Sequence, residues 1–328
     1  MVVLAVATLP GVSEVRARLR SAEPAWIAVA FACSLASALG FVAALVGAFD
    51  RVVPLRRGLV LGMAEQGANV LLPAGGAGGP ALGTLVMRRA GVPPEIAAER
   101  HVALFLITSA VGFVALVVFG TLEAANVLPG DAPLVGTLLP AVAGASVIAG
   151  VALFSRGNSG PEPAAERRVA HAAWRLRDFL RTGVRTSLAL LGRRDAMLIG
   201  GALAYYAFDV AALGATFQAF GGGAPPLGIF VLAYTIGHAG AFIPTPGGVG
   251  GTDGGLIGMF AAFGTPLALA TASVLSYRVF QLGLPTVLGA VSLARIRSLL
   301  RRGDARSEVA ERFAGLETRS GVGPRAPG

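Results

Sequence analysis

Eight polar side chains lie within long apolar stretches of the sequence, where a charge or an amide is costly unless it has a partner or a function. Glu65 and Asn69 are four residues apart and therefore share one face of a helix. We expect seven of the eight to line the path of a polar substrate through a membrane: Glu65, Gln66, Asn69, His238, Asp253, Tyr277 and Arg278. The eighth, Asp209, is a candidate for coupling such a transfer to a proton.

Arg278 is the cation expected at the same depth as the carboxylates. A carboxylate inside a membrane has to be paired or protonated. We therefore expect Asp253 or Asp209 to pair with Arg278. The pair could serve the substrate or could only lock two helices together, and both interpretations stay open at the level of sequence.

The remaining reactive residues form no catalytic or metal-binding pattern. The three histidines, His101, His171 and His238, are scattered along the chain without metal-ligand spacing. The single cysteine, Cys33, lies in an apolar stretch without a nearby base. We predict a protein that is not an enzyme, holds no metal and takes no cofactor.

Two glycine- and proline-rich stretches interrupt the apolar segments 55–90 and 226–263. Proline and clustered glycines end helices, so each segment is predicted to form two half-helices around a turn. The turn residues are Pro73, Gly75, Gly76, Gly78 and Gly79 in the first segment, and Pro244, Pro246, Gly247, Gly248, Gly250 and Gly251 in the second. Free N–H groups at half-helix N-termini suit an anion such as a lipid phosphate, although glycines equally permit close helix packing.

The composition requires a membrane around these segments. Hydrophobic residues make up 54% of the chain and charged residues only 14%, whereas soluble domains carry about 25% charge. Stretches long enough to span a bilayer cover residues 25–49, 102–122, 132–155, 196–220 and 266–294. We predict an all-α polytopic membrane protein with about six or seven full spans plus two re-entrant helical hairpins broken by Gly and Pro.

The order Pro, Gly-Gly-x-Gly-Gly, Met, Gly-x-Pro occurs twice, which indicates an internal repeat. Residues 1–298 are predicted to form one transmembrane domain, followed by a disordered cytoplasmic tail, 299–328. Within the domain, repeat one covers about 25–122, a basic interfacial segment covers 156–195, and repeat two covers about 196–295.

Charge sets the expected orientation. The formal net charge is +9, and the arginines stand in short loops, as the positive-inside rule requires, so we do not expect nucleic-acid binding. Segment 156–195 and the C-terminus should be cytoplasmic. The first hairpin would then enter from the cytoplasm and the second from outside, an inversion typical of transporters. The absence of lysine and the abundance of Ala and Gly indicate a GC-rich bacterial genome, hence the bacterial inner (plasma) membrane.

The second glycine-rich stretch carries a family resemblance. Residues 243–253, the Gly264-Thr265-Pro266 turn and the Ser276-Tyr277-Arg278 run resemble the lysylphosphatidylglycerol synthase transmembrane region, also called flippase-like membrane proteins. The resemblance extends from about Ala25 to Ala294 and is weaker in the first loop. Asp253 stands where the family more often has Glu, Pro80-Ala81 replaces polar residues, and the aminoacyl-transferase domain of lipid-modifying members is missing.

The resemblance implies flippase- or scramblase-like translocation of a phospholipid or lipid-linked glycan, with the headgroup crossing a polar cleft. The implied partners are anionic or polyprenyl-linked membrane lipids and envelope-biosynthesis enzymes. Two alternatives stay open: a secondary transporter of a small solute or ion, and a non-transporting accessory subunit of a cell-envelope lipid pathway.

Overall fold

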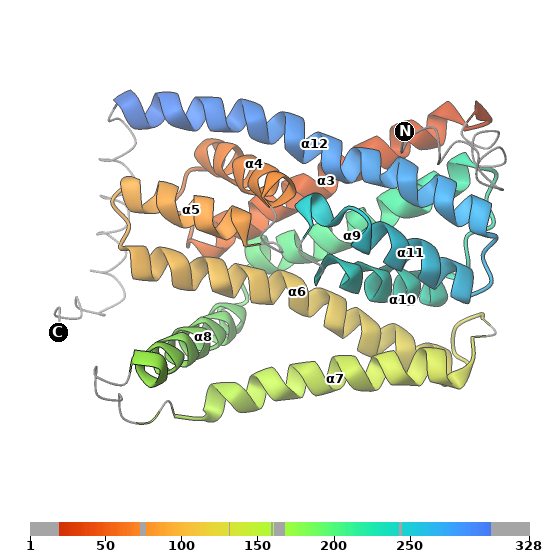
Figure 1. Cartoon of the computed structure of the whole chain (residues 1–328), viewed down its shortest axis with the longest axis horizontal. Coiled ribbons are helices and arrows are strands. Elements are labelled where there is room, and N and C mark those ends of the chain that lie inside the picture. The colour runs from red at the N-terminus through yellow and green to blue at the C-terminus, as the bar shows by residue number, and fades with distance from the viewer. Residues whose placement is uncertain are drawn as a thin grey trace.

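The computed structural model describes residues 20–72, 77–130, 132–158, 160, 168–242 and 245–302. These residues form helices and connecting turns, and no strand occurs among them. The helices run mostly along the long axis of the molecule (Figure 1). Of the predicted turn residues, Pro73, Gly75, Gly76 and Pro244 lie outside the described residues.

Five helices in the described part of the chain are long and apolar enough to cross a membrane. They are α3 (Pro24–Ala48), α6 (Pro94–Ala124), α7 (Leu134–Arg156), α9 (Ala196–Ala219) and α12 (Leu267–Arg302). Their positions match the five long apolar stretches of the sequence. An all-helical multi-pass membrane protein is therefore confirmed, while residues 1–19, where a further span would begin, lie outside the described residues.

Two helical hairpins interrupt this series where Gly and Pro predicted breaks. The first hairpin joins α4 (Leu55–Leu71) to α5 (Gly78–Arg89). The second hairpin joins α10 (Leu227–Gly237) to α11 (Gly251–Ala262) through the short 3₁₀ helices η1 (His238–Phe242) and η2 (Pro246–Gly248). Figure 1 shows the first hairpin in one half of the molecule's length and the second hairpin in the other.

Helices α3 and α9 cross in very close antiparallel contact. A Cβ atom on Gly40 would lie 2.5 Å from the Tyr205 nitrogen, and one on Gly201 would lie 2.4 Å from the Ala44 nitrogen. Only glycine allows backbones to approach this closely. Beside these two helices, α4 of the first hairpin packs on α12, the long helix after the second hairpin. In the same way, α10 of the second hairpin packs on α6, the long helix after the first hairpin.

Arginines collect at one end of the molecule and tie its loops together. Asp50 accepts hydrogen bonds from Arg100 at 2.7 Å and from Arg193 at 2.8 Å, and Arg51 lies 2.8 Å from Asp195. This links the turn after α3, the start of α6 and the turn before α9. It is the end that the positive-inside rule predicts to be cytoplasmic.

The predicted tail needs one correction. Residue 299 was expected to begin a disordered segment, but α12 continues as helix to Arg302. The run Leu299-Leu300-Arg301-Arg302 contains strong helix formers, so the long helix propagates through the expected boundary. Residues 303–328 lie outside the described residues.

Candidate functional site

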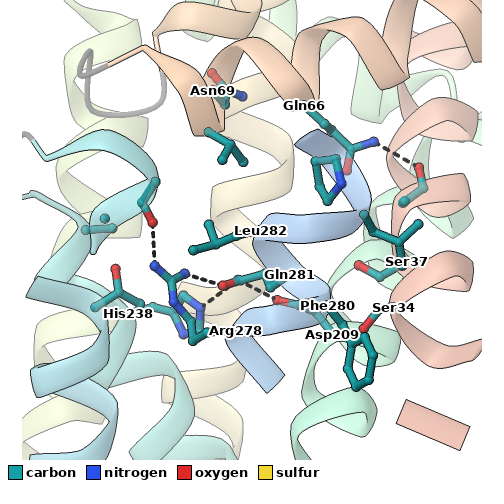
Figure 2. A pocket seen from close by; sticks show the side chains of 18 of the residues that line it. Ser34, Ser37, Gln66, Asn69, Asp209, His238, Arg278, Phe280, Gln281 and Leu282 are labelled. Carbon is teal, nitrogen blue, oxygen red and sulfur yellow. Dashed lines mark hydrogen bonds between the residues drawn. The ribbon is translucent and has the colours of Figure 1, made fainter. Parts of the chain in front are cut away.

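A cavity of about 430 Å³ lies between the two hairpins and is walled by α3, α4, α6, α9 and α12 (Figure 2). Its polar lining comes from both hairpins and from the helices beside them: Ser34, Ser37, Gln66, Asn69, Ser109, Tyr205, Asp209, His238, Thr245, Thr252, Arg278 and Gln281. Apolar side chains complete the wall: Val70, Phe105, Phe280, Leu282, Leu284 and Pro285. The cavity is therefore amphipathic.

Arg278 on α12 is the cation of this cavity. Its Nε donates to Oδ1 of Asp253 over 2.6 Å, and its two Nη groups donate to the Gln281 amide oxygen and to the Gly247 carbonyl. A guanidinium has five N–H donors, so two are not engaged with described residues. The buried charge is thus paired and still keeps donors available for an anion in the cavity.

Asp253 is held by the turn that precedes α11. Gly247 and Gly250 adopt positive φ angles of 61° and 87°, a backbone conformation that favours glycine. In this geometry the N–H of Gly250 donates to Oδ2 of Asp253 over 2.9 Å. Of the two carboxylates expected to pair with Arg278, Asp253 is the one that does so.

Asp209 on α9 is bound by neutral donors instead. Its Oδ2 accepts from the hydroxyls of Tyr234 and Tyr277, the latter at 2.7 Å, and from the amide of Gln281 at 3.4 Å. Gln281 therefore connects Asp209 to Arg278 without direct ion pairing. Because Asp253 balances Arg278, an ionised Asp209 leaves one uncompensated negative charge at the cavity.

His238 sits where the second hairpin meets the cavity. Its Nδ1 lies 3.0 Å from the Tyr234 carbonyl oxygen, an acceptor, which assigns the ring hydrogen to Nδ1. The other nitrogen, Nε2, lies 3.3 Å from the Gln281 amide nitrogen and accepts from it. This pattern describes a neutral imidazole.

The half-helix N-termini near the cavity already carry acceptors. The Asn69 side-chain oxygen accepts the N–H of Gly79 at the start of α5 over 2.6 Å, and Asp253 does the same for α11. These intramolecular caps occupy donors that the sequence had assigned to a lipid phosphate. Arg278 is the cationic side chain among the described residues that line the cavity.

Of the residues predicted for the substrate path, Asp253 and Tyr277 reach the cavity only through the lining side chains that they bind, Arg278 and Asp209, and Glu65 does not line it. Glu65 turns towards α6, where its Oε1 lies 2.9 Å from Nε2 of His101, and both side chains are 1% exposed. The other ring nitrogen of His101 lies 2.7 Å from the Ala97 carbonyl oxygen. Gln66 and Asn69, its neighbours on α4, do line the cavity.

Three residues of these networks were not among those predicted for the substrate path: His101, Tyr234 and Gln281. A charged Glu in an apolar helix signals that a partner must exist, but His101 lies 36 positions further along the chain. Gln281 carried a local signal, because it follows Arg278 by three residues and shares its helix face. Among the described residues, no group of three His, Cys, Asp or Glu side chains could hold a metal ion.

A family model described as "Lysylphosphatidylglycerol synthase TM region" matches residues 1–289. The match includes both hairpins and all the side chains around the cavity. No curated protein matches the chain.

Proposed function

Because the chain belongs to the family of the lysylphosphatidylglycerol synthase transmembrane region, we propose that it translocates a lipid headgroup through the cavity between its two hairpins. The substrate is a phospholipid or a lipid-linked glycan, and its tails stay in the bilayer during transfer. The protein performs no chemistry on the lipid and needs no cofactor.

The observation that carries this proposal is the amphipathic cavity lined by an arginine that is ion-paired and still has N–H donors to spare. Arg278 keeps two N–H donors beyond its bonds to Asp253, Gln281 and Gly247. A phosphate oxygen accepts charge-assisted hydrogen bonds from a guanidinium in this arrangement. Phe105, Phe280 and Leu284 form an apolar wall on which the upper acyl or polyprenyl carbons can lie.

The two hairpins enter the membrane from opposite sides and return to the side they came from. Their helices contain 17, 12, 11 and 12 residues. At 1.5 Å per residue even the longest rises only about 26 Å, less than the roughly 30 Å hydrocarbon core. The positive-inside rule supports an orientation with the arginine-rich end, and with it the end of α12, on the cytoplasmic side of a bacterial membrane; both hairpin turns would then lie towards the midplane.

Asp209 provides the coupling site of this mechanism. It is the carboxyl group among the described lining residues, its hydrogen-bond donors are neutral, and Gln281 links it to Arg278. Proton uptake at Asp209 would remove the excess negative charge when a phosphate approaches. We expect an imposed pH gradient to change the initial translocation rate of the wild type and to leave the rate of Asp209→Asn unchanged. An equal response of both proteins would remove Asp209 from the mechanism.

The function is tested with purified protein in liposomes that contain a trace of fluorescent anionic phospholipid. A membrane-impermeant quencher reports which labelled headgroups reach the outer leaflet. We expect the wild type to make the protected inner pool accessible, and Arg278→Ala to lose most of this activity. Val279→Ala, a change at an exposed neighbour on α12, is the matched control and should behave as wild type.

Failure of the wild type in this assay, with folding confirmed, would contradict lipid translocation. That result would favour one of the two alternative functions, a secondary transporter of a solute or ion or an accessory subunit of an envelope-lipid pathway. Equal activity of Arg278→Ala and wild type would instead leave the function standing and remove the cavity from the path.

A further inference from the structure

Helix α8 (Arg168–Gly192) carries a continuous stripe of small and apolar residues on one face. The stripe consists of Leu176, Leu180, Gly183, Ser187 and Leu190, spaced alternately by four and three residues. Residues at this spacing lie one above another along a helix. A stripe of this kind needs a partner along its whole length.

The structure covers only the C-terminal half of the stripe. Gly183 lies so close to α6 that a Cβ atom there would be 2.4 Å from a methyl carbon of Val102. Ser187 and Leu190 are buried with it. Leu176 and Leu180, by contrast, are 59% and 42% exposed. The same face therefore continues beyond α6 into the surroundings of the protein.

Two arginines fix α8 at the end of a membrane-spanning helix. Arg181 donates to the Phe154 carbonyl over 3.3 Å and its guanidinium lies 4.8 Å from the centre of the Phe154 ring. Arg185 donates to the carbonyls of Ser155 and Gly157. These carbonyls belong to the last turn of α7, whose partial negative charge favours cations.

This anchoring sets the depth of α8. Because α7 ends at Arg156, the contacts with Phe154, Ser155 and Gly157 hold the middle of α8 level with the end of this candidate span, where we expect the hydrocarbon core to give way to headgroups. Figure 1 shows α8 between α6 and α7, near the end of the molecule where α7 finishes. The exposed half of the stripe therefore meets lipid at that level.

Charge selects the kind of lipid. Arg175 and Arg177 flank Leu176 and are exposed. Helix α8 as a whole contains five arginines and one aspartate. Each basic residue near an anionic leaflet strengthens attachment by about fivefold. Two leucines are too small a surface for a stable protein interface, which needs about 800 Å² on each partner.

We propose that the N-terminal half of α8 is a docking surface for anionic membrane lipid. Leu176 and Leu180 lie at the boundary between headgroups and acyl chains, and Arg175 and Arg177 contact the phosphates above it. The surface is separate from the cavity and does not depend on translocation. It holds the connection between α7 and α9 against the arginine-rich side of the membrane.

The test uses a spin label and needs no transport activity. Leu176→Cys is labelled in a Cys33→Ala background, and Ala189→Cys, an exposed position on the opposite side of α8, is the matched control. Both proteins are placed in vesicles of phosphatidylcholine with phosphatidylglycerol, and in phosphatidylcholine alone. Collisions with oxygen report the apolar layer, and collisions with a water-soluble nickel chelate report the aqueous phase.

We expect the label at position 176 to collide mainly with oxygen and the label at 189 mainly with the nickel chelate. Removing charge by Arg175→Gln together with Arg177→Gln should abolish the extra immersion that phosphatidylglycerol gives. Equal nickel accessibility at 176 and 189 would overturn the proposal. Protection of position 176 from both reagents would overturn it too, because it would show a protein covering this face instead of lipid.

Discussion

The two hairpins are each tied to the long helix that follows them by one acid–base pair, but the surroundings of the pairs differ. In the first hairpin Glu65 meets His101 of α6, with both side chains 1% exposed. In the second hairpin Asp253 meets Arg278 of α12, with the side chains 18% and 7% exposed. We call these the dry pair and the cavity pair.

The dry pair is closed to a substrate. Both nitrogens of His101 face acceptors, the Ala97 carbonyl and Glu65, so one proton must lie between Glu65 and His101. The second carboxylate oxygen of Glu65 is buried without a hydrogen-bond partner among the described residues. The cavity pair keeps spare donors on Arg278. A similar pair is therefore sealed from the cavity in the first hairpin, whereas in the second hairpin we propose that its arginine binds an anion.

The largest effect is expected from breaking the dry pair. His101→Ala leaves the Glu65 carboxyl buried without its partner, and the loss of a buried pair member costs about 3–5 kcal/mol. The unfolding free energy in mixed micelles should fall by that amount. Replacing both residues together, by Glu65→Met and His101→Leu, should recover most of it. A His101→Ala protein as stable as wild type would show that the pair does not hold the hairpin.

Breaking the cavity pair should affect activity more than stability. Arg278→Ala removes charge-assisted hydrogen bonds worth about 1.5–3 kcal/mol, which corresponds to a loss of at least about tenfold in translocation rate. Exchanging the charges, Asp253→Arg with Arg278→Asp, should recover folding but not translocation. Recovery of both by the exchanged pair would mean that the pair only locks α11 to α12.

A smaller effect on the free energy of unfolding is expected from alanine substitutions at two glycines of the second hairpin, Gly247 and Gly254. Gly247→Ala should cost about 1–2 kcal/mol, because φ is 61° there and a Cβ atom would lie 2.9 Å from a Leu282 methyl carbon. Gly254→Ala lies in open space within α11 and should stabilise the protein by up to about 1 kcal/mol. Thermal unfolding of the two variants in the same detergent measures the difference. Equal changes in the unfolding temperature of the two variants would show that a side chain at Gly247 does not strain the turn.

The smallest expected effect concerns Asp209. Tyr277→Phe removes one of the two hydroxyls that donate to its Oδ2, while Tyr234 and Gln281 remain. The net contribution of one such hydrogen bond is about 1 kcal/mol. Chemical unfolding should register this loss without a change of fold. A loss several times larger would mean that the two tyrosines act as one cooperative unit.

Sequence alone located the five spans of the described residues, both helix breaks and Asp253 as one of two candidate partners of Arg278, because hydrophobic length, Gly-Pro clusters and intramembrane charge are local signals. The sequence did not show which neighbouring helix the Glu65 side chain faces. The four-residue spacing showed that Glu65 and Asn69 share a helix face, but not that the edge of this face bearing Glu65 packs against α6. His101 and Asp209 find their partners through contacts between distant segments, and no local pattern records these.

We propose that the cavity pair takes part in headgroup transfer, whereas the dry pair only stabilises the fold. The most direct measurement is the liposome accessibility assay on the Glu65→Met, His101→Leu double variant beside Arg278→Ala. We predict translocation near the wild-type rate for the double variant and little for Arg278→Ala. Loss of translocation in a folded double variant, with activity retained in Arg278→Ala, would contradict the account.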